Sequence, residues 1–88
     1  MLSQRRKRTI LERVYRVRLE NVRKIIQSMH RPGSDMGGSV RLARILGCTP
    51  PFITMIAGDR PIRTISETLA REIEVKLGLL PGYLDQIH

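Results

Sequence analysis

The sequence predicts an all-α fold, a compact bundle of about five helices. Apolar residues recur every three or four positions, and no stretch alternates as a strand would. Glycine, proline and capping residues divide the chain into short helical segments. Its 88 residues, 41% hydrophobic and 27% charged, suit a single domain with one core. We expect a basic N-terminal arm or helical extension over residues 1–15 and one domain over residues 16–88.

The first helix is expected over about residues 9–29, because residues 5–31 contain neither glycine nor proline. Thr9 and Glu12 fit a capping box that would start this helix. The apolar positions allow either one long helix or a break near residues 17–20 that separates an arm from a first core helix.

Four further segments follow, each bounded by capping residues, glycine or proline: residues 39–46, 50–57, 64–77 and a last short turn over 81–84. Ser39 and Thr49 are expected to cap the second and third helices, and Pro50 suits the first helical position. Thr64 and Glu67 form a second capping box, which is expected to open the fourth helix.

Several classes of function are excluded by composition. One cysteine cannot form an internal disulfide, and two histidines give no metal-ligand spacing, so we expect no metal and no cofactor. No nucleophile or acid–base constellation stands out, so the chain is not expected to be an enzyme. No apolar run is long enough to span a membrane, and arginines interrupt the region where a signal peptide needs an apolar core. A reduced, cytoplasmic protein is therefore expected.

Charge is distributed unevenly along the chain. Residues 1–31 carry ten basic and two acidic side chains, whereas residues 32–88 carry six of each. Such asymmetry indicates a polyanionic partner, either nucleic acid or an acidic membrane surface. The basic arm comprises Arg5, Arg6, Lys7 and Arg8. It would either grip a DNA groove or phosphates, or extend a helix into a partner contact.

Only Gly47, Cys48 and Thr49 connect the second and third segments. A connection of three residues sets two helices at a steep angle, the helix-turn-helix geometry. The pattern Leu42-Ala43-x-x-Leu46-Gly47-Cys48-Thr49-x-x-x-Ile53-x-x-Ile56 resembles the helix-turn-helix of the Cro and phage-repressor (xenobiotic-response-element) family. The resemblance spans about residues 19–85, continuing through Gly58-Asp59-Arg60-Pro61-Ile62 and then Ala70-Arg71-Glu72-Ile73-Glu74-x-x-Leu77-Gly78-Leu79-x-Pro81-Gly82-Tyr83-Leu84-Asp85.

The resemblance implies a small, prophage-type regulator that binds double-stranded DNA by sequence, represses transcription and acts as a homodimer on an inverted repeat. It would work in the bacterial nucleoid or a phage-infected cell. Residues 50–57 would be the recognition helix. Its base-reading residues would be Thr49, Pro50, Pro51, Thr54 and Met55. The phosphate-contacting residues would be Ser39, Arg41, Arg44, Arg60 and Arg63.

Other roles stay open for several residues. The same scaffold would serve as a protein-interaction module, with Pro50, Pro51 and Met55 as an apolar face that binds RNA polymerase or another regulator. Met55 is alternatively a dimer or loop contact, and Arg44 a solvated surface charge. Cys48 is expected to be a small buried residue, and Phe52 part of the core.

Overall fold

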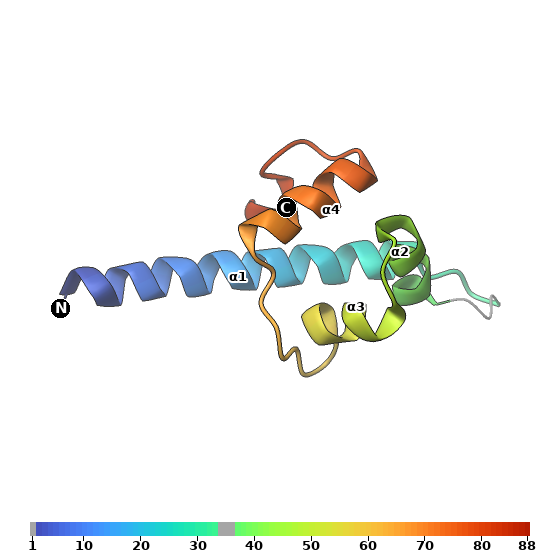
Figure 1. Ribbon diagram of the computed structural model, residues 1–88, viewed down its shortest axis with the longest axis horizontal. Helices are drawn as coiled ribbons and strands as arrows, with labels where there is room; N and C mark the ends of the chain where they lie inside the picture. The colour runs from blue at the N-terminus through green and yellow to red at the C-terminus, as the bar shows by residue number, and fades with distance from the viewer. Residues whose placement is uncertain (1, 34–36) are drawn as a thin grey trace.

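The computed structural model describes residues 2–33 and 37–88, with side chains from Ile10 onward. This part of the chain has no strand, so the all-α prediction is confirmed (Figure 1). Its elements are α1 (Leu2–Met29), α2 (Gly38–Leu46), α3 (Pro50–Ala57), α4 (Glu67–Leu77) and the 3-10 turn η1 (Tyr83–Asp85). The last of the five expected elements is thus a single turn, and four are α-helices.

Helix α1 is longer than predicted and unbroken. The predicted start at Thr9 is wrong, because α1 runs from Leu2 to Met29. Of the two alternatives for its middle, the structure has the single long helix and not the break near residues 17–20. Residues 2–8 are mostly good helix formers without glycine or proline, so the helix extends toward the N-terminus. Within the proposed break, Arg18 is buried and its side chain binds the C-terminal segment, so the backbone there stays helical.

Helix α2 begins before the predicted cap. Gly37, not Ser39, is the N-cap residue, and Ser39 is the second residue of the helix. The reason is the close approach of α2 to α1 at Gly38, where a Cβ atom would collide with the backbone carbonyl of Ile26. The helix therefore starts at a glycine that tertiary packing requires.

Helix α4 also begins later than predicted. Ser66, not Thr64, is its N-cap, and the Ser66 hydroxyl accepts a hydrogen bond from the Leu69 N–H at 3.2 Å. Ile65 lies between the two candidates and is buried, so the chain is still extended there and enters the helix only afterwards. The predicted end at Gly78 is confirmed.

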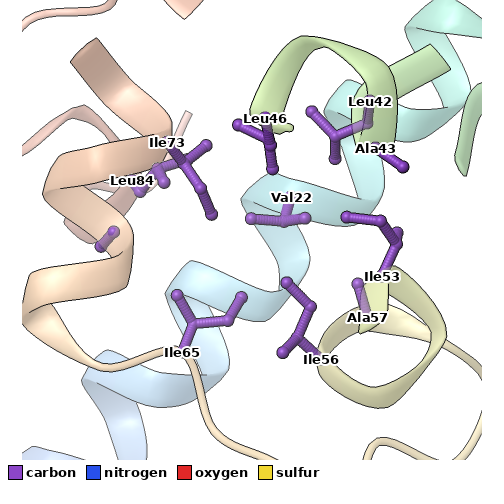
Figure 2. Packing of buried hydrophobic residues seen from close by; sticks show 11 residues of the cluster. Val22, Leu42, Ala43, Leu46, Ile53, Ile56, Ala57, Ile65, Ile73 and Leu84 are labelled. Carbon is purple, nitrogen blue, oxygen red and sulfur yellow. The ribbon is translucent and has the colours of Figure 1, made fainter. Parts of the chain in front are cut away.

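The core gathers around Val22 of α1, which lies between residues from α2, α3 and the C-terminal part of the chain (Figure 2). Its buried residues are Val22, Leu42, Ala43, Leu46, Ile53, Ile56, Ala57, Ile65, Ala70, Ile73 and Leu84. Phe52 and Cys48 are half-buried and pack against this cluster. Burial raises the pKa of the Cys48 thiol, as expected for a packing residue rather than a reactive one.

Two polar side chains of α1 bind the C-terminal segment. The Arg18 guanidinium donates to Asp85 Oδ1 at 2.6 Å and Oδ2 at 3.1 Å, and to the Ile65 carbonyl at 3.0 Å. The Asn21 amide donates to the Leu84 carbonyl at 2.9 Å. Both side chains are buried, and these bonds fix η1 against the middle of α1.

Glu74 is a fully buried carboxylate on α4. It accepts hydrogen bonds from the Gly82 N–H at 3.1 Å and the Leu84 N–H at 2.9 Å. Arg71 compensates its charge: the Arg71 Nη2 donates to Glu74 Oε2 at 3.2 Å, and the Nε lies 2.7 Å from Oε1 without hydrogen-bond alignment. Glu74 thereby folds the residues after α4 back onto the helix.

The shape is drawn out along α1. The radius of gyration is 13.9 Å, compared with about 12 Å expected for a compact chain of this length. The N-terminal half of α1 extends beyond all other elements and accounts for the difference (Figure 1). Among residues 2–33 and 37–88, no single helix is long and apolar enough to cross a bilayer. Helices α2 and α3 meet that criterion only as a pair, and the pair is bent by 108°.

Candidate nucleic-acid interface

The joint between α2 and α3 is a sharp turn closed by backbone hydrogen bonds. The helices are bent by 108° across residues 47–49. Gly47 has a φ of 72°, which only glycine adopts without strain. The Gly47 N–H donates to the Arg44 carbonyl at 3.3 Å, and the Cys48 N–H donates to the Ala43 carbonyl at 2.9 Å. These two bonds satisfy the end of α2 and fix where α3 begins.

Two long basic side chains hold the ends of these helices from outside the joint. Lys76 Nζ donates to the Leu46 carbonyl at the end of α2, at 2.6 Å. Arg23 reaches the end of α3, where its Nη2 donates to the Gly58 carbonyl at 2.5 Å. The sequence contains no signal for either contact, because the residues are 30 and 35 positions apart.

The start of α3 is exposed, and the first four residues of the helix, residues 50–53, have no free backbone N–H. Thr49, Pro50, Pro51 and Thr54 are exposed, as expected for base-reading residues. The two prolines have no N–H, and the next two N–H groups both donate to the Thr49 carbonyl, at 3.0 and 3.4 Å. The Thr54 hydroxyl donates to the Pro50 carbonyl at 3.3 Å, so its lone pairs remain for a ligand. A ligand here would meet side chains rather than backbone amides.

Met55 is half-buried and anchors the loop after α3. Its carbonyl accepts hydrogen bonds from the N–H groups of Ile62 and Arg63, at 3.0 and 3.1 Å. The same loop places the Arg63 guanidinium over the Phe52 ring, 5.9 Å from its centroid. The backbone of Met55 therefore fixes the loop after α3, while its side chain is half-buried, unlike the exposed side chain of Thr54.

The predicted phosphate-contacting arginines form two groups. Arg41 and Arg44 lie on α2 and line, with Arg31 from the end of α1, a surface hollow of about 420 Å³. Arg60 and Arg63 are exposed on the loop that follows α3. The first group therefore belongs to the helix before α3, and the second to the loop after it. Sequence reasoning did not include Arg31, whose only signal was its position at the end of a basic helix.

Two further predictions concern Ser39 as a phosphate contact and residues 5–8 as a basic arm. Ser39 is half-buried in the first turn of α2, two residues after the N-cap Gly37. The backbone of Arg5, Arg6, Lys7 and Arg8 is helical, and their side chains lie outside the described part of the structure. Residues 2–15 therefore continue α1.

The chain matches no protein family, no curated protein and no solved structure. No group of three or more His, Cys, Asp or Glu side chains gathers as a metal site within the described residues.

Proposed function

We propose that the protein is a sequence-specific, double-stranded DNA-binding transcription regulator that uses α2 and α3 as a helix-turn-helix. The observation that carries the proposal is the bend of 108° between two short helices, the second of which begins with exposed residues. Arginines on the helix before α3 and on the loop after it support the proposal. Helix-turn-helix units join their helices at about 90–120° and insert the second helix into the major groove. The resemblance to phage repressors, carried by the residues from Leu42 to Ile56, points the same way.

In this proposal α3 enters the major groove with its N-terminal end first. The hydroxyl groups of Thr49 and Thr54 hydrogen-bond to base edges, while Pro51 and Met55 contact thymine methyl groups. Residues 50–53 have no free backbone N–H, so within α3 these side chains are the source of sequence preference. Arg23 and Lys76 act indirectly by holding the ends of the two helices in place.

The two arginine groups bind the phosphate backbone on either side of the groove. Arginine binds phosphate through planar, charge-assisted hydrogen bonds. Four arginines in each copy give eight phosphate contacts in a dimer: Arg41, Arg44, Arg60 and Arg63. Such a dimer would lose about 10⁴-fold in affinity between 50 and 200 mM salt. A helix of eight residues reads only a few base pairs, so we propose a homodimer on an inverted repeat with half-sites about 34–36 Å apart.

The test is selection from a random duplex library at 150 mM salt, followed by sequencing of the bound DNA. An enriched inverted repeat is the expected result. The double substitution Thr54→Ala/Arg60→Ala should then abolish the preference for the enriched site over random DNA. The control Thr68→Ala/Lys24→Ala also removes one hydroxyl group and one positive charge, but from α4 and α1, outside the proposed DNA-contacting residues. It should keep the preference.

Two outcomes contradict the proposal. In the first, the protein retains DNA without enriching any sequence, and deletion of residues 1–8 removes this binding. That result would indicate nonspecific coating of DNA by the basic arm. No retention at 50 mM salt would favour the protein-interaction module, whose apolar face would include Pro50, Pro51 and Met55.

A further inference from the structure

A pocket of about 300 Å³ lies between α1, the end of α3 and the loop that follows α3. Helix α1 contributes Tyr15, Arg16 and Leu19, α3 contributes Ile56, and the loop contributes residues 61–65. This volume is at the lower end of the range for small-molecule sites, about 300–1,000 Å³. A cavity of about 150 Å³ can hold benzene, so this pocket has room for an aromatic ring with a short polar substituent.

The inner walls of the pocket are held in place by the fold. Ile56 and Ile65 are each 1% exposed and belong to the hydrophobic core (Figure 2). The Arg18 guanidinium lies over the Tyr15 ring, 5.8 Å from its centroid, and Asp85 fixes that guanidinium through an ion pair. These walls exist without a ligand, so binding requires little ordering of the chain.

The outer wall is a loop that is fastened through its backbone. The N–H groups of Ile62 and Arg63 both donate to the Met55 carbonyl, at 3.0 and 3.1 Å. The Ile62 side chain borders the pocket and is nevertheless 78% exposed. An apolar group in the pocket would remove part of this side chain from water, which favours binding.

The charge of the pocket is positive. Among the described residues that line it, Arg16 and Arg63 are basic and none is acidic. The Arg63 guanidinium lies over the ring of Phe52, a residue that does not line the pocket. Arg16 is exposed, and within the described part of the chain its side chain has no hydrogen-bond or ion-pair partner. The pocket therefore combines apolar walls with one guanidinium that is available to an anion.

We propose that this pocket binds a small monocarboxylate with an apolar body. The apolar body lies against Ile56, Ile62 and Ile65, and the carboxylate accepts hydrogen bonds from the Arg16 guanidinium at the mouth of the pocket. A single negative charge is the best match, because one guanidinium is available and the remaining walls are mostly apolar.

Titration of the full chain with phenylacetate, followed in amide NMR spectra, tests the site. The amide signals of residues 15–19 and 62–65 should shift together, with a dissociation constant of about 1 mM. The uncharged analogue phenylacetamide has nearly the same shape and should bind about 3–5-fold more weakly, the difference expected for an exposed ion pair. The absence of shifts at 10 mM phenylacetate, or equal affinity for the two compounds, would refute the proposal.

A pair of aspartate substitutions tests the location of the ligand. Ile62→Asp places a negative charge and removes an apolar group at the pocket wall, so phenylacetate should bind about 10-fold more weakly. The matched control is Leu80→Asp in the loop after α4, which should leave the affinity unchanged. Ile62 and Leu80 are 78% and 80% exposed, so both variants should fold, and circular dichroism checks this. Equal affinities in the two variants would place the ligand elsewhere and overturn the proposal.

A pair of glutamine substitutions tests the partner of the carboxylate. Arg16→Gln should reduce the preference for phenylacetate over phenylacetamide to below about 2-fold. Arg13 is exposed one turn earlier on α1 and does not line the pocket, so Arg13→Gln should keep the preference. A preference that survives Arg16→Gln would contradict the assignment of the carboxylate to this residue.

The assays contain no DNA, so their results are independent of the proposed function. A chain that binds phenylacetate as expected but selects no DNA sequence would support the pocket and refute the proposed DNA binding. A chain that selects DNA but binds no phenylacetate would do the reverse. Ile56 belongs to α3, so the bound acid would contact the proposed recognition helix directly and act as an effector of DNA binding. This role, unlike the binding itself, rests on the proposed function.

Discussion

Removal of the Glu74 carboxylate is the sharpest test of how the C-terminal segment is held. In Glu74→Ala, the N–H groups of Gly82 and Leu84 lose their acceptor, and Arg71 loses one of its two carboxylate partners. The site is fully buried, so water cannot replace the lost acceptor without opening the structure.

The expected cost is about 3–5 kcal/mol. Each hydrogen bond to a charged group contributes about 1.5–3 kcal/mol, so the two backbone bonds give about 3–6 kcal/mol. Releasing the carboxylate from its buried position offsets part of this, which agrees with the 3–5 kcal/mol typical for removing one partner of a buried ion pair. A domain of this size has a total stability of about 4–13 kcal/mol, so the loss is between about a quarter of the total and all of it.

Urea unfolding followed by circular dichroism measures the effect. The matched control is Glu72→Ala on the same helix, where the carboxylate is 55% exposed and lies 3.6 Å from Lys76 Nζ. The control should change the free energy of unfolding by less than about 0.5 kcal/mol. If Glu74→Ala loses less than about 1 kcal/mol, its hydrogen bonds do not hold the segment and the reasoning fails.

Two further predictions concern packing and pH. Gly38→Ala should destabilise the fold by about 1–3 kcal/mol, because the new methyl group collides with the backbone of α1, whereas Gly37→Ala has open space and should cost about 0.5 kcal/mol or less in the same urea assay. Hydrogen bonding to Arg18 lowers the pKa of Asp85 below its ordinary 3.8, so this group stabilises the fold above that pH and loses its contribution as the pH falls through the lower folded-state value. The stability difference between wild type and Asp85→Asn should therefore shrink below pH 3.8, and a difference that stays constant down to pH 2 would contradict the assignment.

Local signals in the sequence predicted much of the fold. The ends of α2 and α4 follow from Gly47 and Gly78, because a left-handed turn requires glycine whatever surrounds it. The predicted start of α3 at Thr49 and Pro50 is confirmed, with Pro50 at the first helical position. The Thr49 side chain, however, makes no capping hydrogen bond. Each of these signals lies within one turn of the boundary that it marks.

The starts of α2 and α4, which were predicted wrongly from the sequence, depend on tertiary contacts. The capping pattern favoured Thr64 over Ser66, but burial of Ile65 keeps the chain extended past Thr64. Ser39 was displaced by the approach of Gly38 to α1, which no pattern in the sequence shows.

The candidate interface likewise combines features that local sequence patterns predict with features that only the folded structure shows. The exposed residues at the start of α3 follow from helical spacing, whereas the anchoring by Arg23 does not. Arg23 and Arg18 were counted with the basic residues of residues 1–31 that indicate a polyanionic partner. Both bind groups of their own chain more than 30 positions away. Net charge alone therefore overstates the positive charge left for a partner.

The contacts of Arg18 with Asp85 and of Asn21 with Leu84 also affect how the chain is made. They join residues 67 and 63 positions apart, nearly the whole length of the sequence. During synthesis α1 emerges before α2, α3 and α4, and it lacks these partners until the residues after α4 have been added. Contacts of such long range form late and slow the search for the folded state. The nascent helix thus keeps its future core face in water until the segment after α4 has emerged, a period in which chaperones have access to it.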